Sequence, residues 1–319
     1  MRIGILALAL ATISLAWGVV AQDASGPKPK RAKPPTFESS KTEGIFYSNL
    51  FEKGLVGARP ADFGAAKSPG AGPSIGPGPA GSNDPPAGGG FAWSKIISSE
   101  TLQDEIKATK LSIDTFVSTP NAYAAGGNKD ARREFSVLAV LFGVVAEFDG
   151  DTRFKKEAPA MRDALARVGF NSKVGTVQVY NEAKQRKQDL ADLIGGNIPK
   201  LPEPEGKANW SKLADRAALM QRLEIGEKRI APATANKGEF SKSEDRILAD
   251  AEVMGVIAEA IGREGYDLAD DKDYQGHLAK LKKAMHDLAE AVRLKNADAA
   301  RTAAGMMSQS CTQCHSQFR

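Results

Sequence analysis

Cys311 and Cys314 are the only two cysteines of the sequence, and His315 follows them directly. Two thiols separated by two residues can each form a thioether bond with a vinyl group of haem, and the adjacent imidazole can then bind the iron. We therefore predict one covalently attached haem c, with His315 as an iron ligand. Because there is no further cysteine, one haem per chain is also the upper limit.

Two other kinds of chemistry use cysteines at this spacing. A thioredoxin-like dithiol normally opens a helix that follows a strand, whereas this pair ends a helical pattern. A zinc site would need more ligands, and the remaining candidates are His277 and His286, with no second cysteine pair. Both histidines adjoin core positions at the edge of a predicted helix face, and we expect them to be surface or boundary residues. The haem interpretation is the one that the motif favours.

The elements that must position this motif are helices, since apolar residues recur at steps of three and four throughout the last third of the chain. Asn296 is the expected N-cap of the final helix, which ends in the cysteine motif, and Ser241 with Glu244 predicts a capping box for an earlier one. A helix from about Trp210 through Met220 to Arg229 gives a fourth. The apolar faces of two of these helices are Leu278, Leu281, Met285, Leu288 and Val292, and Ile247, Ala251, Met254, Ala258 and Ile261.

The chain also repeats itself. Trp93-Ser94-Lys95 returns 117 positions later as Trp210-Ser211-Lys212, and residues 142–147 return 112 positions later as residues 254–259. Two matches in the same order predict a duplication, with chance similarity between helical stretches as the alternative.

The predicted domains follow from this repeat. We expect an N-terminal helical half at residues 92–198 and a C-terminal helical half at residues 209–319, joined by a linker at residues 199–208 that is rich in proline and charge. Pro159 puts the third helix of the N-terminal half in doubt.

The N-terminal half lacks the residues of the predicted haem site. The positions equivalent to Cys311 and Met220 are Ile194 and Gln103. We therefore expect this half to be haem-free and kept for docking, dimerisation or rigid spacing.

The N-terminus has the pattern of an export signal. Arg2 precedes an apolar stretch and a small-residue cleavage site before Gln22, so residues 1–21 are predicted to be a signal peptide and the protein to be periplasmic. An uncleaved membrane anchor is the alternative. Residues 22–91 form a Pro/Gly-rich linker that cannot bury a core, and we expect it to be disordered apart from an apolar segment at residues 45–51.

Charge is balanced along the chain, with 43 basic and 39 acidic residues. Without a dense basic stripe we expect no nucleic-acid partner. Nothing after the N-terminal segment predicts a membrane span, so the mature chain is expected to have none.

The C-terminus resembles a known family. Residues 294–300, the cysteine motif and the final Ser316-Gln317-Phe318-Arg319 are similar to the last helix of the cytochrome c′ family, whose chains end in Phe-Arg or Tyr-Arg. Arg216 followed by Met220 is similar to that family's first helix. The resemblance covers about residues 209–319 and implies an all-α fold, an antiparallel four-helix bundle with the haem at its C-terminal end.

The resemblance also suggests roles on the other side of the iron. Met220 stands where the low-spin members of the family have a methionine as the sixth ligand, which suits electron transfer. In high-spin members that position is open to small gases. An ordinary core methionine is the alternative for Met220. Arg216 is carried over as a haem-binding residue, and Arg319, four residues after His315, can reach a haem propionate.

These features predict an exported cytochrome c, not an enzyme, that transfers single electrons to redox partner proteins which the sequence does not identify. A haem protein that binds nitric oxide or carbon monoxide is the first alternative. A haem-stabilised adaptor, acting through the N-terminal half and residues 45–51, is the second. A homodimer is compatible with each of these functions.

Overall fold

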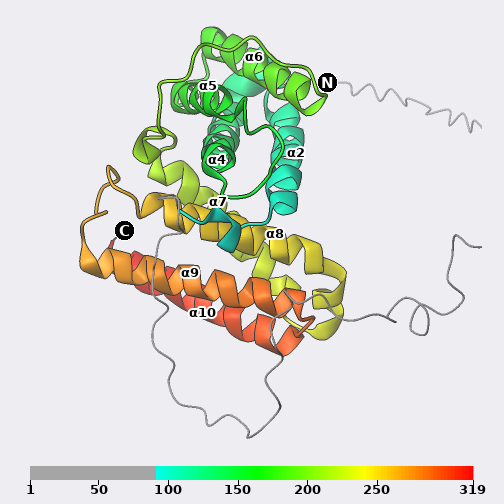
Figure 1. The fold of residues 1–319 in the computed structure, drawn as a ribbon, viewed down its shortest axis with the longest axis vertical. Coiled ribbons are helices and arrows are strands. Elements are labelled where there is room, and N and C mark those ends of the chain that lie inside the picture. Colours follow the sequence, from blue (N-terminus) through cyan, green and yellow to red (C-terminus); the bar gives the residue numbers. More distant parts are fainter. Residues whose placement is uncertain (1–90, 319) are drawn as a thin grey trace, which may run out of the picture. The chain divides into compact units, whose positions relative to one another are not determined.

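The computed structural model describes residues 91–318, and residues 1–90 and Arg319 lie outside the described range. Several predictions therefore concern residues outside the described range. These are the signal peptide, almost all of the linker 22–91 with its segment 45–51, and Arg319. The described residues belong to a single compact unit of the chain. Their secondary structure is helical, without a strand (Figure 1), which confirms the all-α prediction.

The N-terminal half is built from four longer helices and three short helical segments. Pro159 lies in the first turn of α5, where a backbone N–H would have no intrahelical partner in any case. The helix that Pro159 put in doubt is therefore present. Helix α4 packs against α2 and α5, and α6 packs against both α2 and α5. The elements are η2 (Trp93–Lys95), α2 (Ser99–Phe116), α3 (Pro120–Ala122), η3 (Tyr123–Gly127), α4 (Asn128–Glu147), α5 (Ala158–Asn171) and α6 (Val177–Ile194).

The C-terminal half has four long helices that pack in sequence. Helix α8 contacts α7 and α9, and α10 contacts α9 and α7. The two apolar faces expected on α8 and α9 are buried. The elements are η4 (Trp210–Lys212), α7 (Arg216–Ala233), α8 (Lys237–Ile261), α9 (Lys272–Arg293) and α10 (Ala297–Gln317).

Two helices, α7 and α8, begin at other residues than the sequence predicted. The capping box at Ser241 was wrong, because Asn236 starts α8 one turn earlier and its Oδ1 accepts the Glu239 N–H at 3.0 Å. The helix expected from Trp210 is broken, since Asp215 is extended at the N-cap of α7 and separates it from the turn η4. The N-cap at Asn296 is confirmed, with its side-chain oxygen 3.0 Å from the Ala299 nitrogen.

The two halves share a register at their first elements. Both the turn η2 and the helix α2 return 117 positions later, as η4 and α7, with the same lengths. Trp93 and Trp210, which open the two turns, are both buried. The halves are in contact through α4 with α7, α2 with α8 and α4 with α8, and one hydrophobic core runs through both.

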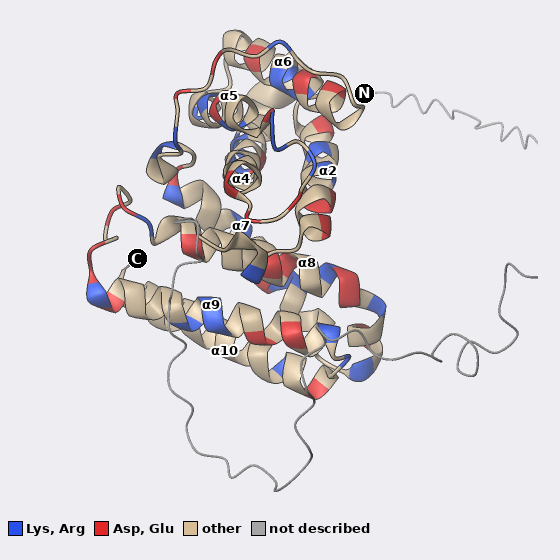
Figure 2. Ribbon diagram, viewed as in Figure 1, with Lys and Arg blue, Asp and Glu red and all other residues tan. Residues whose placement is uncertain are grey.

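Basic and acidic residues are interspersed along the helices (Figure 2), as the balanced composition indicates. None of the described helices is both long enough and apolar enough to cross a lipid bilayer.

Candidate haem site

Helix α10 carries the cysteine motif in its last two turns. Its buried face runs through Ala300, Ala303 and Met307, and the same helical spacing brings Cys311 and Cys314 against the edge of the core. Both thiols are half-buried and neither forms a disulfide. His315 is exposed at the same end of the helix.

A cavity of about 340 Å³ lies beside the motif, and Cys311, Cys314 and His315 line it. Its volume is within the range of roughly 300–1,000 Å³ that is usual for small-molecule and cofactor sites. The wall comes from the three other long helices of this half, and much of it is apolar. The apolar wall residues are Leu223, Ile261, Leu278 and Leu281.

Met220 lines this same cavity from α7, together with Leu223, Glu224 and Glu227. These residues stand at steps of three, four and seven, so one face of α7 is turned to the cavity. The structure thus brings Met220 together with the cysteine motif, although more than ninety positions separate them in the sequence.

His277 is the site residue that the sequence analysis misjudged. It was expected at the surface or the boundary, but it is only 8% exposed and lines the cavity from α9. Its Nε2 lies 2.9 Å from Oε1 of Gln317, whereas its Nδ1 is buried without a hydrogen-bond partner among the described residues. A buried ring nitrogen without a partner is costly, so the site has a polar group available for a bound molecule.

The environment of the thiols disfavours a dithiol redox centre. Burial raises the pKa of Cys311 to about 11, and the nearby charge of Glu227 acts in the same direction. Burial also raises the pKa of Cys314, while the positive charge of Arg216 opposes the shift. Reactive redox cysteines have lowered pKa values because the thiolate is the nucleophile, and these thiols are shifted the other way.

Arg216 and Arg319 are not brought into the cavity by the described contacts. Arg216 begins α7, donates from Nη1 to the Asp267 carbonyl at 2.9 Å and lies 5.9 Å from the ring centre of Tyr274. It is near Cys314 but is not part of the cavity wall. Arg319 lies outside the described residues.

The zinc alternative finds no support in the described part of the chain. No three His, Cys, Asp or Glu side chains there lie close enough together to hold a metal ion. His286 lies on the wall of a different cavity, with Lys282, Lys283 and Arg293.

Residues 268–319 match the model of the cytochrome C′ family. The resemblance predicted from the sequence is confirmed over these residues, which are similar to the corresponding part of haem-binding c-type cytochromes. No curated protein and no solved structure matches the chain.

The residues present fit the covalent haem c that this family implies. The cavity adjoins both attachment thiols and the imidazole, its wall is largely apolar, and the buried Nδ1 of His277 lacks a partner in the described residues. Apolar walls and a few polar groups with defined partners are typical of haem pockets.

Proposed function

We propose that the chain is an exported c-type cytochrome that carries one haem and transfers single electrons between redox proteins. The observation that supports this function best is the common cavity of Met220 and the cysteine motif. A thioether opposite a histidine is the ligand pair that raises the reduction potential of haem iron and suits electron transfer.

Each residue of the cavity has a distinct part in this proposal. Cys311 and Cys314 would hold the haem through thioether bonds, and His315 and Met220 would bind the iron from α10 and α7. The haem iron supplies reversible uptake and release of one electron. The aliphatic wall keeps water from the site, and Nδ1 of His277 can accept a hydrogen bond from a polar group within it, since Nε2 faces the amide oxygen of Gln317.

We also propose that each half is a four-helix bundle and that the two halves arose by duplication. The equal offset of 117 positions between η2 and η4 and between α2 and α7 supports this origin. The N-terminal half lacks a cysteine, so one haem per chain follows.

Optical spectroscopy and a potentiometric titration of the haem-loaded chain test the proposed function. We expect a low-spin spectrum in both oxidation states and a reversible one-electron transition. A high-spin spectrum that shifts when nitric oxide is added would instead support a gas-binding haem protein. The variant Cys311→Ala/Cys314→Ala is expected to lose the covalent haem and the transition with it.

A further inference from the structure

Two residues that occupy equivalent positions in the two halves touch each other. Glu105 on α2 and Arg222 on α7 are separated by 117 positions, the offset of the repeat, and Arg222 Nη2 lies 3.4 Å from Glu105 Oε2. Both side chains are buried. In a symmetric dimer, a residue meets its own counterpart only at the two-fold axis.

A second equivalent pair lies in contact as well. Trp93 and Trp210 have ring centres 5.1 Å apart, and the guanidinium of Arg263 lies 4.5 Å from each ring. Arg263 also reaches Glu147 and Glu259, each at 3.4 Å. These two glutamates are equivalent at the offset of 112, so a single arginine joins two pairs of equivalent residues.

Two further contacts between the halves mirror each other. Gly143 on α4 packs so closely that a Cβ atom there would lie 3.0 Å from Leu213 Cδ1, and one at Gly255 on α8 would lie 3.0 Å from Ile96 Cγ2. Gly143 corresponds to Gly255, and Ile96 corresponds to Leu213. Each half thus packs an aliphatic side chain at the equivalent position against the equivalent glycine of the other half, as expected of an isologous interface.

We infer that the two halves are joined across a local two-fold axis, and that the N-terminal half acts as a tethered partner subunit of the haem-carrying half. This role goes beyond electron transfer, although it rests on the duplication proposed above.

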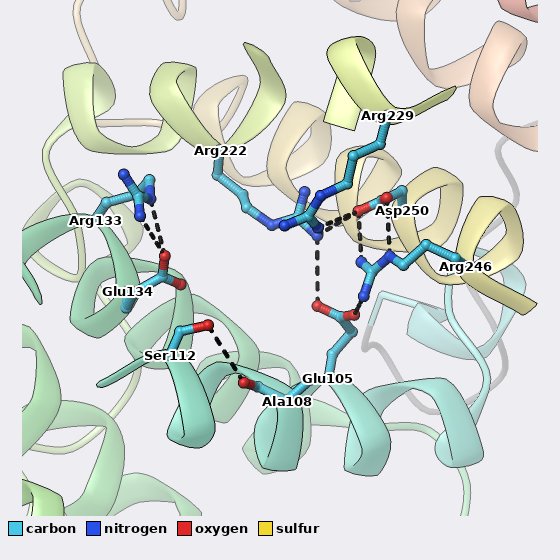
Figure 3. Close-up of polar contacts among 9 residues, drawn as sticks. All are labelled: Glu105, Ala108, Ser112, Arg133, Glu134, Arg222, Arg229, Arg246 and Asp250. Carbon is cyan, nitrogen blue, oxygen red and sulfur yellow. Dashed lines mark hydrogen bonds and ion pairs between the residues drawn. The ribbon is translucent and has the colours of Figure 1, made fainter. Parts of the chain in front are cut away.

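Glu105 and Arg222, which we call the axis pair because they meet at the inferred two-fold axis, also determine which halves can associate. Two C-terminal halves in this arrangement would place Arg222 against Arg222, and two N-terminal halves would place Glu105 against Glu105. Like charges that are buried together oppose association, whereas the mixed pair attracts. Arg246 Nη1, 2.7 Å from Glu105, and Arg222 Nη2, 2.7 Å from Asp250, extend the pair into a larger charge cluster, in which Arg246 is partly exposed (Figure 3). The mixed interface is therefore specified by charge as well as by the tether.

Cutting the tether in the folded, haem-loaded protein tests this inference. A specific protease site inserted after the exposed Glu203 allows cleavage between the halves without refolding either of them. We expect the two fragments to elute together as a one-to-one complex in size-exclusion chromatography. Separate elution, or haem-carrying fragments that pair with each other, would overturn the inference.

Charge variants of the cleaved complex test the role of the axis pair. We expect Glu105→Arg to weaken the complex by about 30-fold or more, in line with removal of one partner of a buried charge pair at an interface. Asp114→Arg is the matched control on α2, since Asp114 is partly exposed and pairs with Lys110 of the same helix. It is expected to change the affinity less than about threefold. Equal effects of the two variants would contradict the inference.

A milder set of variants covers the case in which Glu105→Arg does not fold. We expect Glu105→Ala and Arg222→Ala to weaken the complex individually, and the double variant to weaken it at least about fivefold less than the product of the two effects. Independent, multiplicative effects would overturn the role of the pair. Association is read from fragment mass, so loss of electron transfer does not affect the result.

Discussion

Arg222 donates a hydrogen bond of 2.7 Å from Nη2 to Oδ1 of Asp250, whose side chain is completely buried. The same carboxylate accepts two hydrogen bonds from Arg246, one helical turn earlier on α8. Burial alone would favour the neutral acid, but the hydrogen bond from Arg246 and the charges of Arg222 and Arg246 outweigh it, and the pKa of Asp250 is lowered.

Because the pKa of Asp250 is lower in the folded than in the unfolded chain, this carboxylate should contribute stability in a defined pH range. Its contribution is fully present above the unfolded pKa of roughly 3.9 and is lost as the pH falls through the folded pKa. We expect Asp250→Asn to lower the free energy of unfolding by about 3–5 kcal/mol at neutral pH, as when one partner is removed from a buried ion pair. Urea unfolding of both proteins between roughly pH 3 and pH 7 should show the difference shrinking at acidic pH.

The exposed ion pair of Asp104 and Lys107 provides the control for this measurement. Asp104→Asn should cost no more than about 1 kcal/mol, since solvent screens the pair. If Asp250→Asn were equally mild, or if its effect grew on acidification, the assigned pKa direction would be wrong.

Replacing Met220 should change the coordination of the haem iron. Because the proposed sixth ligand is its thioether, we expect Met220→Ala to convert the spectrum from low-spin to high-spin and to allow carbon monoxide and nitric oxide to bind readily. The reduction potential should fall. Absorption spectra of both oxidation states and a potentiometric titration measure these changes.

Met254 is a suitable comparison, because it is fully buried on α8 but is not part of the cavity wall. Met254→Ala should cost about 2–5 kcal/mol of stability, as other large-to-small substitutions in cores do, and leave the spectrum of the folded protein low-spin. A low-spin spectrum in Met220→Ala would refute the assignment, and His277 would then be the next residue of the cavity to test.

The cysteine motif and the helix that carries it could be predicted from the sequence because both are local. The spacing of Cys311, Cys314 and His315 is visible without a structure. Asn296 is an N-cap whose side chain accepts a hydrogen bond from the backbone of Ala299, only three residues later. Local signals still compete, since Asn236 with Glu239 and Ser241 with Glu244 are both plausible caps. The alternative at Asn236 gives a longer helix and was missed.

The contacts between distant residues could not be predicted in this way. Helical periodicity places His277 beside the core residue Leu278, but whether it meets solvent or a cavity depends on how α10 packs. The meeting of Glu105 and Arg222 depends on the arrangement of two halves that are 117 positions apart. The repeat in the sequence shows which residues of the two halves are equivalent, but not that equivalent residues meet at a two-fold axis.

The close packing at Gly143 predicts an unusual response to alanine. In an exposed position of a helix, replacing glycine by alanine stabilises the protein by roughly 0.5–1 kcal/mol, because less backbone entropy is lost. A Cβ atom at Gly143 would lie 3.0–3.3 Å from Leu213 and the Trp210 ring of the other half. We expect Gly143→Ala to be destabilising by about 1–3 kcal/mol, the range for overpacked cores.

Gly276 on α9 is the matched control, since no atom lies within 4 Å of a Cβ built there. Chemical unfolding should show Gly276→Ala to be stabilising, so the two variants should differ in sign. Stabilisation by Gly143→Ala would mean that the interface is looser than described.

Helix α7 should transmit changes in the N-terminal half to the haem cavity. Its Met220 face lines the cavity, while Arg222 enters the charge cluster on another face and meets Glu105 of α2. Since one core runs through both halves, we expect them to unfold as a single cooperative unit.

Removing one partner of a buried pair costs about 3 kcal/mol, and each kcal/mol lowers the unfolding temperature of a domain of this size by roughly 2–4 °C. Glu105→Ala should therefore lower the temperature at which the low-spin spectrum is lost by about 6–12 °C, together with the loss of helical circular dichroism. Asp114→Ala should leave both transitions almost unchanged. A haem transition that stays in place while part of the helical signal is lost earlier would show that the halves unfold independently, and that α7 does not couple them.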